Sequence, residues 1–177
     1  KVESEICTLL KTSTLFPEGS EITVFDVGSY AGNFTKNLRS ELTAVFDGRQ
    51  NFHLFDPNPK HRKKVKKNLD FKYQFHPIAI DSTNGVSDFF VNTNFPASGS
   101  SLQQIVANDN VWRKSRSILM GRRDRGFDRI TVNTQTIDSF CSERSIKAVD
   151  ILKIDVEGNE LRVLSGATDM LKTCSVV

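Results

Sequence analysis

Two carboxylates, Asp155 and Glu157, follow a strongly apolar run over 149–156 and form the densest group of chemically capable residues in the chain. Burying an ionised carboxylate at the end of a strand costs free energy unless the group is hydrogen-bonded or paired with a cation. If the strand continues through both residues, its two-residue period places them on one side. A carboxylate there can act as a general base or can orient an incoming nucleophile. We therefore predict Asp155 and Glu157 as catalytic residues, with helix capping by Glu157 or Asn159 after Gly158 as the alternative.

A glycine turn follows another apolar, β-branched run, over 22–27. Gly28 and Gly32 allow a sharp turn and a close approach of the backbone to a ligand. The free N–H groups of the helix that follows can hold an anion such as a carboxylate. Asp26, at the end of the strand, is placed to meet a positively charged amino group. The turn predicts a ligand site, although strand-to-helix turns also use glycine without any ligand.

The spacing of these glycines narrows the choice of cofactor. It is G-x-x-x-G, whereas a dinucleotide site uses a further glycine where the backbone approaches the pyrophosphate. S-adenosylmethionine has an amino acid end, a sulfonium and a nucleoside, but no pyrophosphate. The spacing therefore favours S-adenosylmethionine over a dinucleotide.

Further candidates stand at the ends of two other apolar runs. Asp56 follows Gly32 at close to the spacing at which an acidic residue binds ribose hydroxyls; the alternative is that it caps a helix opening at Pro57. At the end of the next run, we expect Ile80 against the adenine ring and Asp81 near its exocyclic amine. A buried isoleucine and a turn aspartate are the alternative there.

The elements that position these residues alternate between strands and helices. Apolar runs predict strands over 22–27, 52–55, 73–80, 86–91, 130–137 and 149–156, with one more beginning at 175–177. Apolar stripes predict helices after Gly32, from Pro57 or Pro59, from 136 to 140, and from 161 to 171. This rhythm predicts an α/β fold, a Rossmann-like doubly wound and mostly parallel sheet. We expect an N-terminal helix and turn at 1–21, a main domain at 22–177 with a variable insert near 92–128, and a sheet cut short at its C-terminus.

Composition sets the class of protein. The chain has 177 residues, of which 25% are charged and 38% hydrophobic, typical of one globular domain. Its three cysteines, Cys7, Cys141 and Cys174, are too far apart for a zinc site and indicate free thiols in a reducing compartment. Neither a membrane-spanning run nor a signal peptide is evident. We expect a soluble cytoplasmic protein that requires no metal, although Asp155, Glu157 and a third oxygen ligand leave a divalent-ion site open.

Two basic clusters, over 60–67 and 113–129, are relevant to which kind of molecule the protein binds. Such clusters can bind the phosphates of a nucleic acid, but more commonly they form the solvated side of a helix. A nucleic-acid partner is therefore the second expectation, after a small molecule.

The motifs together resemble the FkbM-type methyltransferases. The first motif of that family is similar to FDVGSYAGNF at 25–34, and its signature block is similar to TIDSF at 136–140 with VDILKIDVEGNELRVLSGA at 149–167. DPNP at 56–59 stands where the family has Glu-Pro, and SGSSL at 98–102 resembles a serine-rich element near its active site. The resemblance implies a class I methyltransferase fold and S-adenosylmethionine as cofactor. The cofactor-binding residues implied by these motifs and strand ends are Asp26, Gly28, Ser29, Tyr30, Gly32, Asn33, Phe34, Asp56, Pro57, Asn58, Ile80 and Asp81.

The same resemblance implies methyl transfer, typically to a hydroxyl oxygen of a sugar or small metabolite. We therefore expect an O-methyltransferase in which Asp155 assists an in-line attack on the sulfonium methyl group. The alternatives are a nucleic-acid methyltransferase that uses the basic clusters, and a catalytically silent module that only binds the cofactor. An NAD-dependent oxidoreductase is the least favoured class, because the pyrophosphate glycine pattern is missing.

Overall fold

The computed structural model describes residues 20–44, 48–92, 102 and 127–177. Several predicted features lie outside these ranges. They are residues 1–19 of the N-terminal helix and turn expected at 1–21, Cys7, nearly all of the insert, the 98–101 part of the serine-rich element and the basic residues at 113–125. Within these ranges, every helix is too short or too polar to cross a bilayer. Cys141 and Cys174 are free thiols, as expected.

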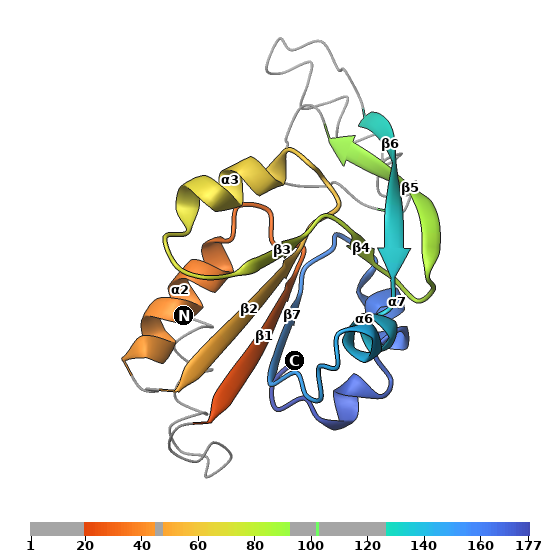
Figure 1. Ribbon diagram of the computed structural model, residues 1–177. Helices are drawn as coiled ribbons and strands as arrows, with labels where there is room; N and C mark the ends of the chain where they lie inside the picture. The colour runs from red at the N-terminus through yellow and green to blue at the C-terminus, as the bar shows by residue number, and fades with distance from the viewer. Residues whose placement is uncertain (1–19, 45–47, 93–101, 103–126) are drawn as a thin grey trace.

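Among the described residues, four parallel strands form the main sheet, in the order β3-β2-β1-β7 (Figure 1). They are β1 (Glu21–Val27), β2 (Arg49–Phe55), β3 (Gln74–His76) and β7 (Ile151–Ile154). Val27 pairs with Phe55 on one side and with Ile154 on the other. The carboxyl ends of β1, β2 and β7 therefore meet at one edge, where an open α/β sheet binds its ligands.

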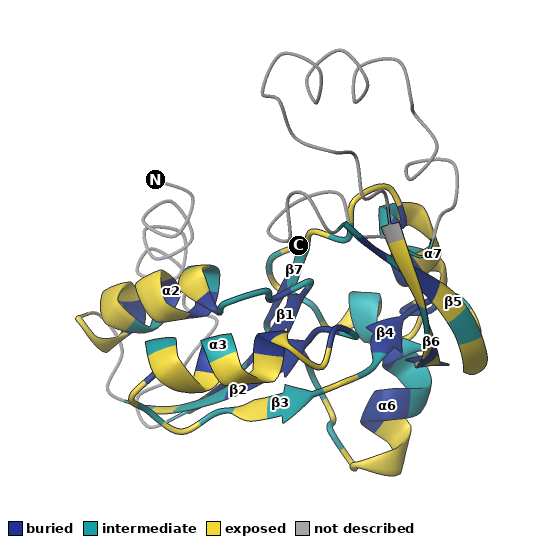
Figure 2. Ribbon diagram, turned by 90° about the horizontal axis from the view of Figure 1, so that it is seen from above, coloured by how far each residue is buried: buried dark blue, intermediate teal, exposed yellow. Residues whose placement is uncertain are grey.

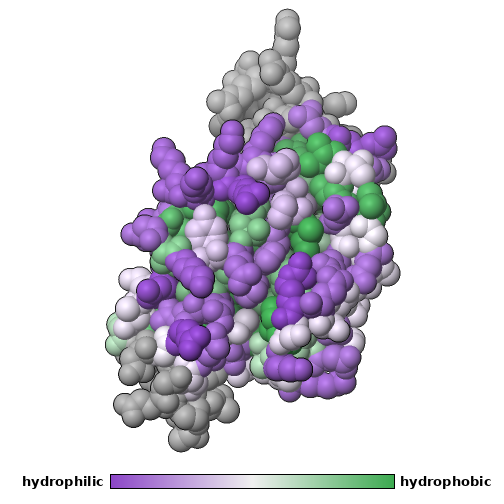
Figure 3. Space-filling view, viewed as in Figure 1, coloured by the Kyte–Doolittle hydropathy of each residue, from purple (hydrophilic) through white to green (hydrophobic). Residues whose placement is uncertain are grey.

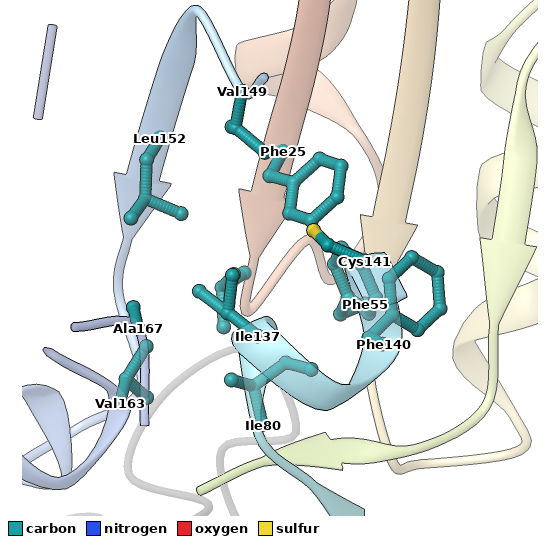
Figure 4. Packing of buried hydrophobic residues seen from close by; sticks show 11 residues of the cluster. Phe25, Phe55, Ile80, Ile137, Phe140, Cys141, Val149, Leu152, Val163 and Ala167 are labelled. Atoms are coloured by element: carbon teal, nitrogen blue, oxygen red, sulfur yellow. The ribbon is translucent and has the colours of Figure 1, made fainter. Parts of the chain in front are cut away.

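Helices cover both faces of this sheet. On one face α2 (Asn33–Thr43) and α3 (His61–Asn68) pack on Val24 and Leu54. On the other, α6 (Ile137–Glu143) and the segment of α7 (Glu160–Ser165) pack on Phe25 and Leu152, as Figure 4 shows. A sheet buried on both faces explains the near-continuous apolar runs of its strands. The predicted doubly wound α/β fold is confirmed.

A smaller sheet stands beside the main one, in the order β4-β6-β5 (Figure 2). Its strands are β4 (Ala79–Ile80), β5 (Gly85–Asn92) and β6 (Phe127–Gln135), and β5 and β6 are antiparallel. The prediction of one strand over 73–80 was wrong, because β3 and β4 belong to different sheets. Pro77 separates them, since proline has no N–H to donate to a ladder.

Other boundaries also differ from the predictions, since β2 begins at Arg49 and β7 covers only Ile151–Ile154. The helix expected to open at Pro57 or Pro59 begins at His61. The helical stripe expected to reach Leu171 is interrupted at Gly166, and a 3₁₀ turn, η1 (Met170–Lys172), follows. The strand expected at 175–177 is a single parallel bridge between Val176 and Ile151.

Candidate functional site

A cavity lies at the edge where the strands of the main sheet end. It encloses about 710 Å³ of free space, its open mouth included. Figure 3 shows strongly hydrophilic surface over α3 and apolar surface toward the smaller sheet on this side of the molecule. The described residues that line the cavity are Val27, Gly28, Tyr30, Phe55, Asp56, Pro57, His61, Ile78, Ala79, Ile80, Phe89, Leu102, Asp155, Val156, Glu157 and Asn159.

The glycine turn forms one wall and is held from two sides. The N–H groups of Gly28 and Ser29 donate to the carbonyl of Phe55, at 2.9 and 3.1 Å. Gly28 has φ +80°, and a Cβ there would overlap the backbone carbonyl of Asp155. Tyr30 also has a positive φ, 49°, which is uncommon for a residue with a side chain. The turn is therefore fixed between the ends of β2 and β7.

Asp56 is the buried carboxylate of this wall, 5% exposed. One oxygen accepts the N–H of Tyr30 at 2.8 Å and lies 2.9 Å from Nδ1 of His61, and the other accepts the N–H of Asn58 at 2.9 Å. Because α3 begins only at His61, with Lys60 at its N-cap, Asp56 does not cap that helix. It closes a turn with Asn58 and fixes Tyr30 and His61 beside the cavity.

Asp155 and Glu157 form the opposite wall, and both are exposed. β7 ends at Ile154 and Glu157 has φ +55°, so the two-residue period does not continue through them. The Asp155 side chain is 70% exposed and lies 3.7 Å from Nζ of Lys153. The expectation that these two carboxylates carry a free-energy cost of burial was therefore wrong. Both carboxylates nevertheless line the cavity, where a substrate can reach them.

A different carboxylate caps the turn after β7. Glu160 Oε1 accepts the N–H groups of Val156 and Gly158, at 3.3 and 3.1 Å. The side chain of Asn159, at the N-cap of α7, makes no capping hydrogen bond. Burial alone would raise the pKa of Glu160, but the backbone hydrogen bonds outweigh it and hold that pKa below its usual range. The cap that the sequence suggested for Glu157 or Asn159 is thus supplied by Glu160.

Asp26 is 1% exposed and turns away from the cavity lining toward α2. It accepts a hydrogen bond from Oγ1 of Thr35 at 2.7 Å, and Nζ of Lys153 lies 3.0 Å from its other oxygen. Lys153 also donates to the carbonyl of Gly28 at 2.9 Å. The cation that meets Asp26 in this structure is therefore a side chain of β7, which ties the glycine turn to the Asp155 segment.

Asp81 is also occupied by a partner. Arg162 of α7 donates to both of its oxygens, from Nε at 2.6 Å and from Nη2 at 3.0 Å. Burial alone would raise the pKa of Asp81, but the hydrogen bonds from Arg162 and Ser82 hold it below its usual range. Ile80 lines the cavity, whereas Asp81 is directed toward α7.

The structure thus brings together half of the predicted site. The cavity is lined by Gly28, Tyr30, Asp56, Pro57, Ile80, Asp155 and Glu157. Its lining does not include the other predicted residues, which are Asp26, Ser29, Gly32, Asn33, Phe34, Asn58 and Asp81. Ligand contacts for all of them stay predictions.

Sequence reasoning missed several residues of the lining. Among them are His61, Ile78, Phe89 and Asn159. His61 was hidden in a basic run, although its place in the first turn of the helix after Asp56 was a usable signal. Ile78 follows Pro77, and Phe89 comes from the smaller sheet. Within the described ranges, no three His, Cys, Asp or Glu residues are grouped so that they could hold a metal ion.

Comparisons with known proteins give the family of the chain. The model of the methyltransferase FkbM domain matches residues 26–177. The 2-O-methyltransferase NoeI of Sinorhizobium fredii (strain NBRC 101917 / NGR234) is 23% identical over 180 residues, which cover 97% of this chain and 65% of that protein. The crystal structure of methyltransferase FkbM from Methylobacillus flagellatus KT aligns with a TM-score of 0.48 and 15% identity, over 93% of this chain and 34% of that one. The chain therefore spans less than two thirds of either relative. Because the family model covers nearly the whole of its described structure, the protein belongs to the FkbM methyltransferase family.

Proposed function

We propose that this methyltransferase uses S-adenosylmethionine to methylate a hydroxyl oxygen of a sugar or small metabolite. One observation carries the proposal: a single cavity joins the Tyr30–Asp56 wall to the Asp155–Glu157 wall. The first wall offers groups that suit a cofactor, and the second offers exposed carboxylates that suit an acceptor. The name of the relative NoeI, a 2-O-methyltransferase, supports oxygen as the acceptor atom.

The residues present fit the cofactor. Ile78, Ile80 and Phe89 give the cavity an apolar side suited to a nucleoside base. An ionised carboxylate has about four acceptor positions, and the three contacts of Asp56 leave room for a ribose hydroxyl. Oδ1 of Asn159 is buried without a hydrogen-bond partner among the described residues. When bound, S-adenosylmethionine supplies an electrophilic methyl group on its sulfonium.

The chain's own part in the reaction is to hold the acceptor and to accept its proton. The exposed Asp155 carboxylate is the group that can take the proton of a hydroxyl as the oxygen becomes a nucleophile. Its backbone is fixed, because its N–H donates to the carbonyl of Val27 at 3.0 Å. Lys153, anchored by Asp26 and Gly28, places a cation 3.7 Å from the carboxylate. Such fixed positions contribute rate through proximity and orientation.

A nucleic-acid acceptor is the second candidate, and one contact favours it. Lys64 of α3 lies with Nζ 4.1 Å from the centroid of the Tyr30 ring, so the basic side of α3 reaches the cavity wall. The exposed cations of α3 and its N-cap are Lys60, Arg62, Lys63, Lys66 and Lys67. Phosphate binding by this side would make turnover fall steeply with salt. A neutral acceptor would show only a weak salt dependence.

Two measurements test the proposed function. S-adenosylhomocysteine should bind in titration calorimetry and raise the melting temperature, because a ligand of the native state alone stabilises it. A radiolabelled methyl-transfer screen over sugars, small hydroxy metabolites and short RNAs should then find its acceptor among the hydroxyl compounds. No binding at saturating ligand would overturn the proposal. Labelling of RNA alone would replace the leading acceptor class with the second.

A further inference from the structure

The carboxylate expected to bind the adenine amine is saturated by the protein itself. Asp81 accepts two hydrogen bonds from Arg162, one from the N–H of Ser82 at 2.8 Å, and one from Nδ2 of Asn159 at 3.4 Å. It is 4% exposed and is directed toward α7. A ligand in the cavity would have to compete with a guanidinium for this group. The acceptor for the adenine amine must therefore be sought among the residues that line the cavity, which do not include Asp81.

Asn159 offers that acceptor. It lines the cavity and is 2% exposed. The hydrogen bond from its Nδ2 to Asp81 fixes which way the amide is turned, because a carboxylate accepts only from the nitrogen. Its Oδ1 is left buried and has no partner among the described residues. Buried acceptors are nearly always paired, so an unpaired one in a cavity wall points to a donor on the ligand.

We propose that Oδ1 of Asn159 accepts a hydrogen bond from the exocyclic amino group of adenine, and so selects adenine over purines that carry a carbonyl at that position. Asn159 contacts Asp81, the residue next to Ile80, so it stands beside the apolar part of the cavity that suits a base. The Asp81–Arg162 ion pair acts through Asn159, because Asp81 accepts a hydrogen bond from the amide nitrogen and leaves the amide oxygen without a partner among the described residues. This inference rests on the proposed use of S-adenosylmethionine.

The test compares two ligands in titration calorimetry. S-adenosylhomocysteine carries the amino group, and S-inosylhomocysteine carries a carbonyl in its place. The wild-type protein should bind the adenine ligand at least about tenfold more tightly, since the inosine carbonyl would leave Oδ1 facing another acceptor. Asn159→Ser keeps a residue favoured at a helix N-cap but shortens the side chain. It should weaken S-adenosylhomocysteine about tenfold and leave S-inosylhomocysteine within about twofold.

Asp56→Asn is the matched control, because Asp56 lines the same cavity on the ribose side. It should weaken both ligands by a similar factor and keep their ratio. A wild-type protein that binds both ligands equally, or an Asn159→Ser variant that keeps the wild-type ratio, would overturn the role of Asn159 and leave the cofactor proposal standing. A wild-type protein that binds neither ligand would overturn both. Circular dichroism and the melting temperature of the ligand-free variants confirm that each is folded before it is titrated.

Discussion

The backbone carbonyl of Asp155 occupies the space that a side chain at Gly28 would need. The glycine that begins the β1 turn is therefore matched to the carboxylate segment at the end of β7, more than a hundred residues later in the chain. The N–H of Asp155 also donates to Val27, the residue before that glycine. The two motifs that most resemble the family are thus parts of one packed edge, whatever ligand binds there.

Gly28→Ala should cost about 2–5 kcal/mol of unfolding free energy. A left-handed backbone costs a residue with a side chain about 1–2 kcal/mol, and overpacking against backbone that cannot move adds about 1–3 kcal/mol. Gly32→Ala is the control, because Gly32 has nearly the same φ, +75°, but faces only the side-chain ends of Leu54 and Leu69. Urea denaturation should show the larger loss for Gly28→Ala. Equal losses would mean that the close approach to Asp155 adds nothing.

Lys153→Met should destabilise the protein by about 3 kcal/mol. It removes the cation 3.0 Å from Asp26, which is 1% exposed, and breaking one side of a buried pair leaves a charge without compensation. Asp26→Asn in the same chain removes that charge and should restore part of the loss, while Thr35 can still donate to the amide oxygen. A double-mutant cycle in urea measures the coupling. Strictly additive losses would show that the pair is not coupled.

Asp155→Asn should lower turnover without destabilising the protein. Its side chain is 70% exposed, so the melting temperature should change little. If the carboxylate takes the acceptor's proton, kcat should fall by about 10²–10⁴, while the calorimetric Kd for S-adenosylhomocysteine stays close to that of the wild type. A loss of cofactor affinity that matches the loss of turnover would instead make Asp155 a cofactor ligand.

Asp56→Ala should show the opposite pattern. It removes a buried acceptor and leaves the N–H groups of Tyr30 and Asn58 without their partner, which costs about 1–3 kcal/mol for each buried group. Both the melting temperature and the affinity for S-adenosylhomocysteine should fall, because the wall that carries Tyr30 and His61 loses its support. An unchanged affinity in the folded variant would remove Asp56 from the proposed cofactor site.

The strands of the main sheet and their carboxyl ends could be predicted because they depend on local pattern. The apolar run before Gly28 ends where β1 ends, and the runs before Asp56 and Asp155 place those residues at the same edge. The contacts that decide each carboxylate's role could not be predicted in this way. Arg162 pairs with Asp81 and Lys153 with Asp26 across long stretches of sequence. Such pairs depend on how α7 and β7 pack, which no local spacing encodes.

Burial was the property hardest to predict from sequence. Asp155 and Asp56 both come after apolar strands, yet the first is exposed and the second is enclosed. The difference comes from the path of the chain beyond each strand. After β2, Asn58 and His61 turn back onto the carboxylate of Asp56, whereas after β7 the Asp155 carboxylate stays 70% exposed, 3.7 Å from Nζ of Lys153. One strong local signal was missed, since Pro77 stands inside the run predicted as a single strand.

A buried histidine, His53, and a half-buried one, His76, should set the acid stability of the protein. Nδ1 of His53 lies 3.1 Å from Nε2 of His76, and both pack against Phe140. Burial, with a smaller contribution from the charge of Arg144, lowers the pKa of His53 to about 4. Burial, the charge of His53 and Arg144 together lower the pKa of His76 to about 4.

The sign of the effect depends on which state binds more protons. Between the ordinary histidine value of 6.5 and about 4, the unfolded chain is protonated at both positions and the folded protein is not. The contribution of these two histidines to the free energy of unfolding is therefore fully present above pH about 7. It falls as the pH drops from about 6.5 to 4, and below that the two groups cause no further loss. Asp81, whose pKa is lowered, contributes its own loss only at more acidic pH.

His76→Phe keeps an aromatic ring against Phe55 and Phe140 but removes one titrating group, so the fall in melting temperature between pH 6.5 and 4 should be roughly halved. Each protein is compared with itself at pH 8, so a general loss of packing does not affect the slope. A variant with the wild-type slope would show that His76 does not titrate on unfolding.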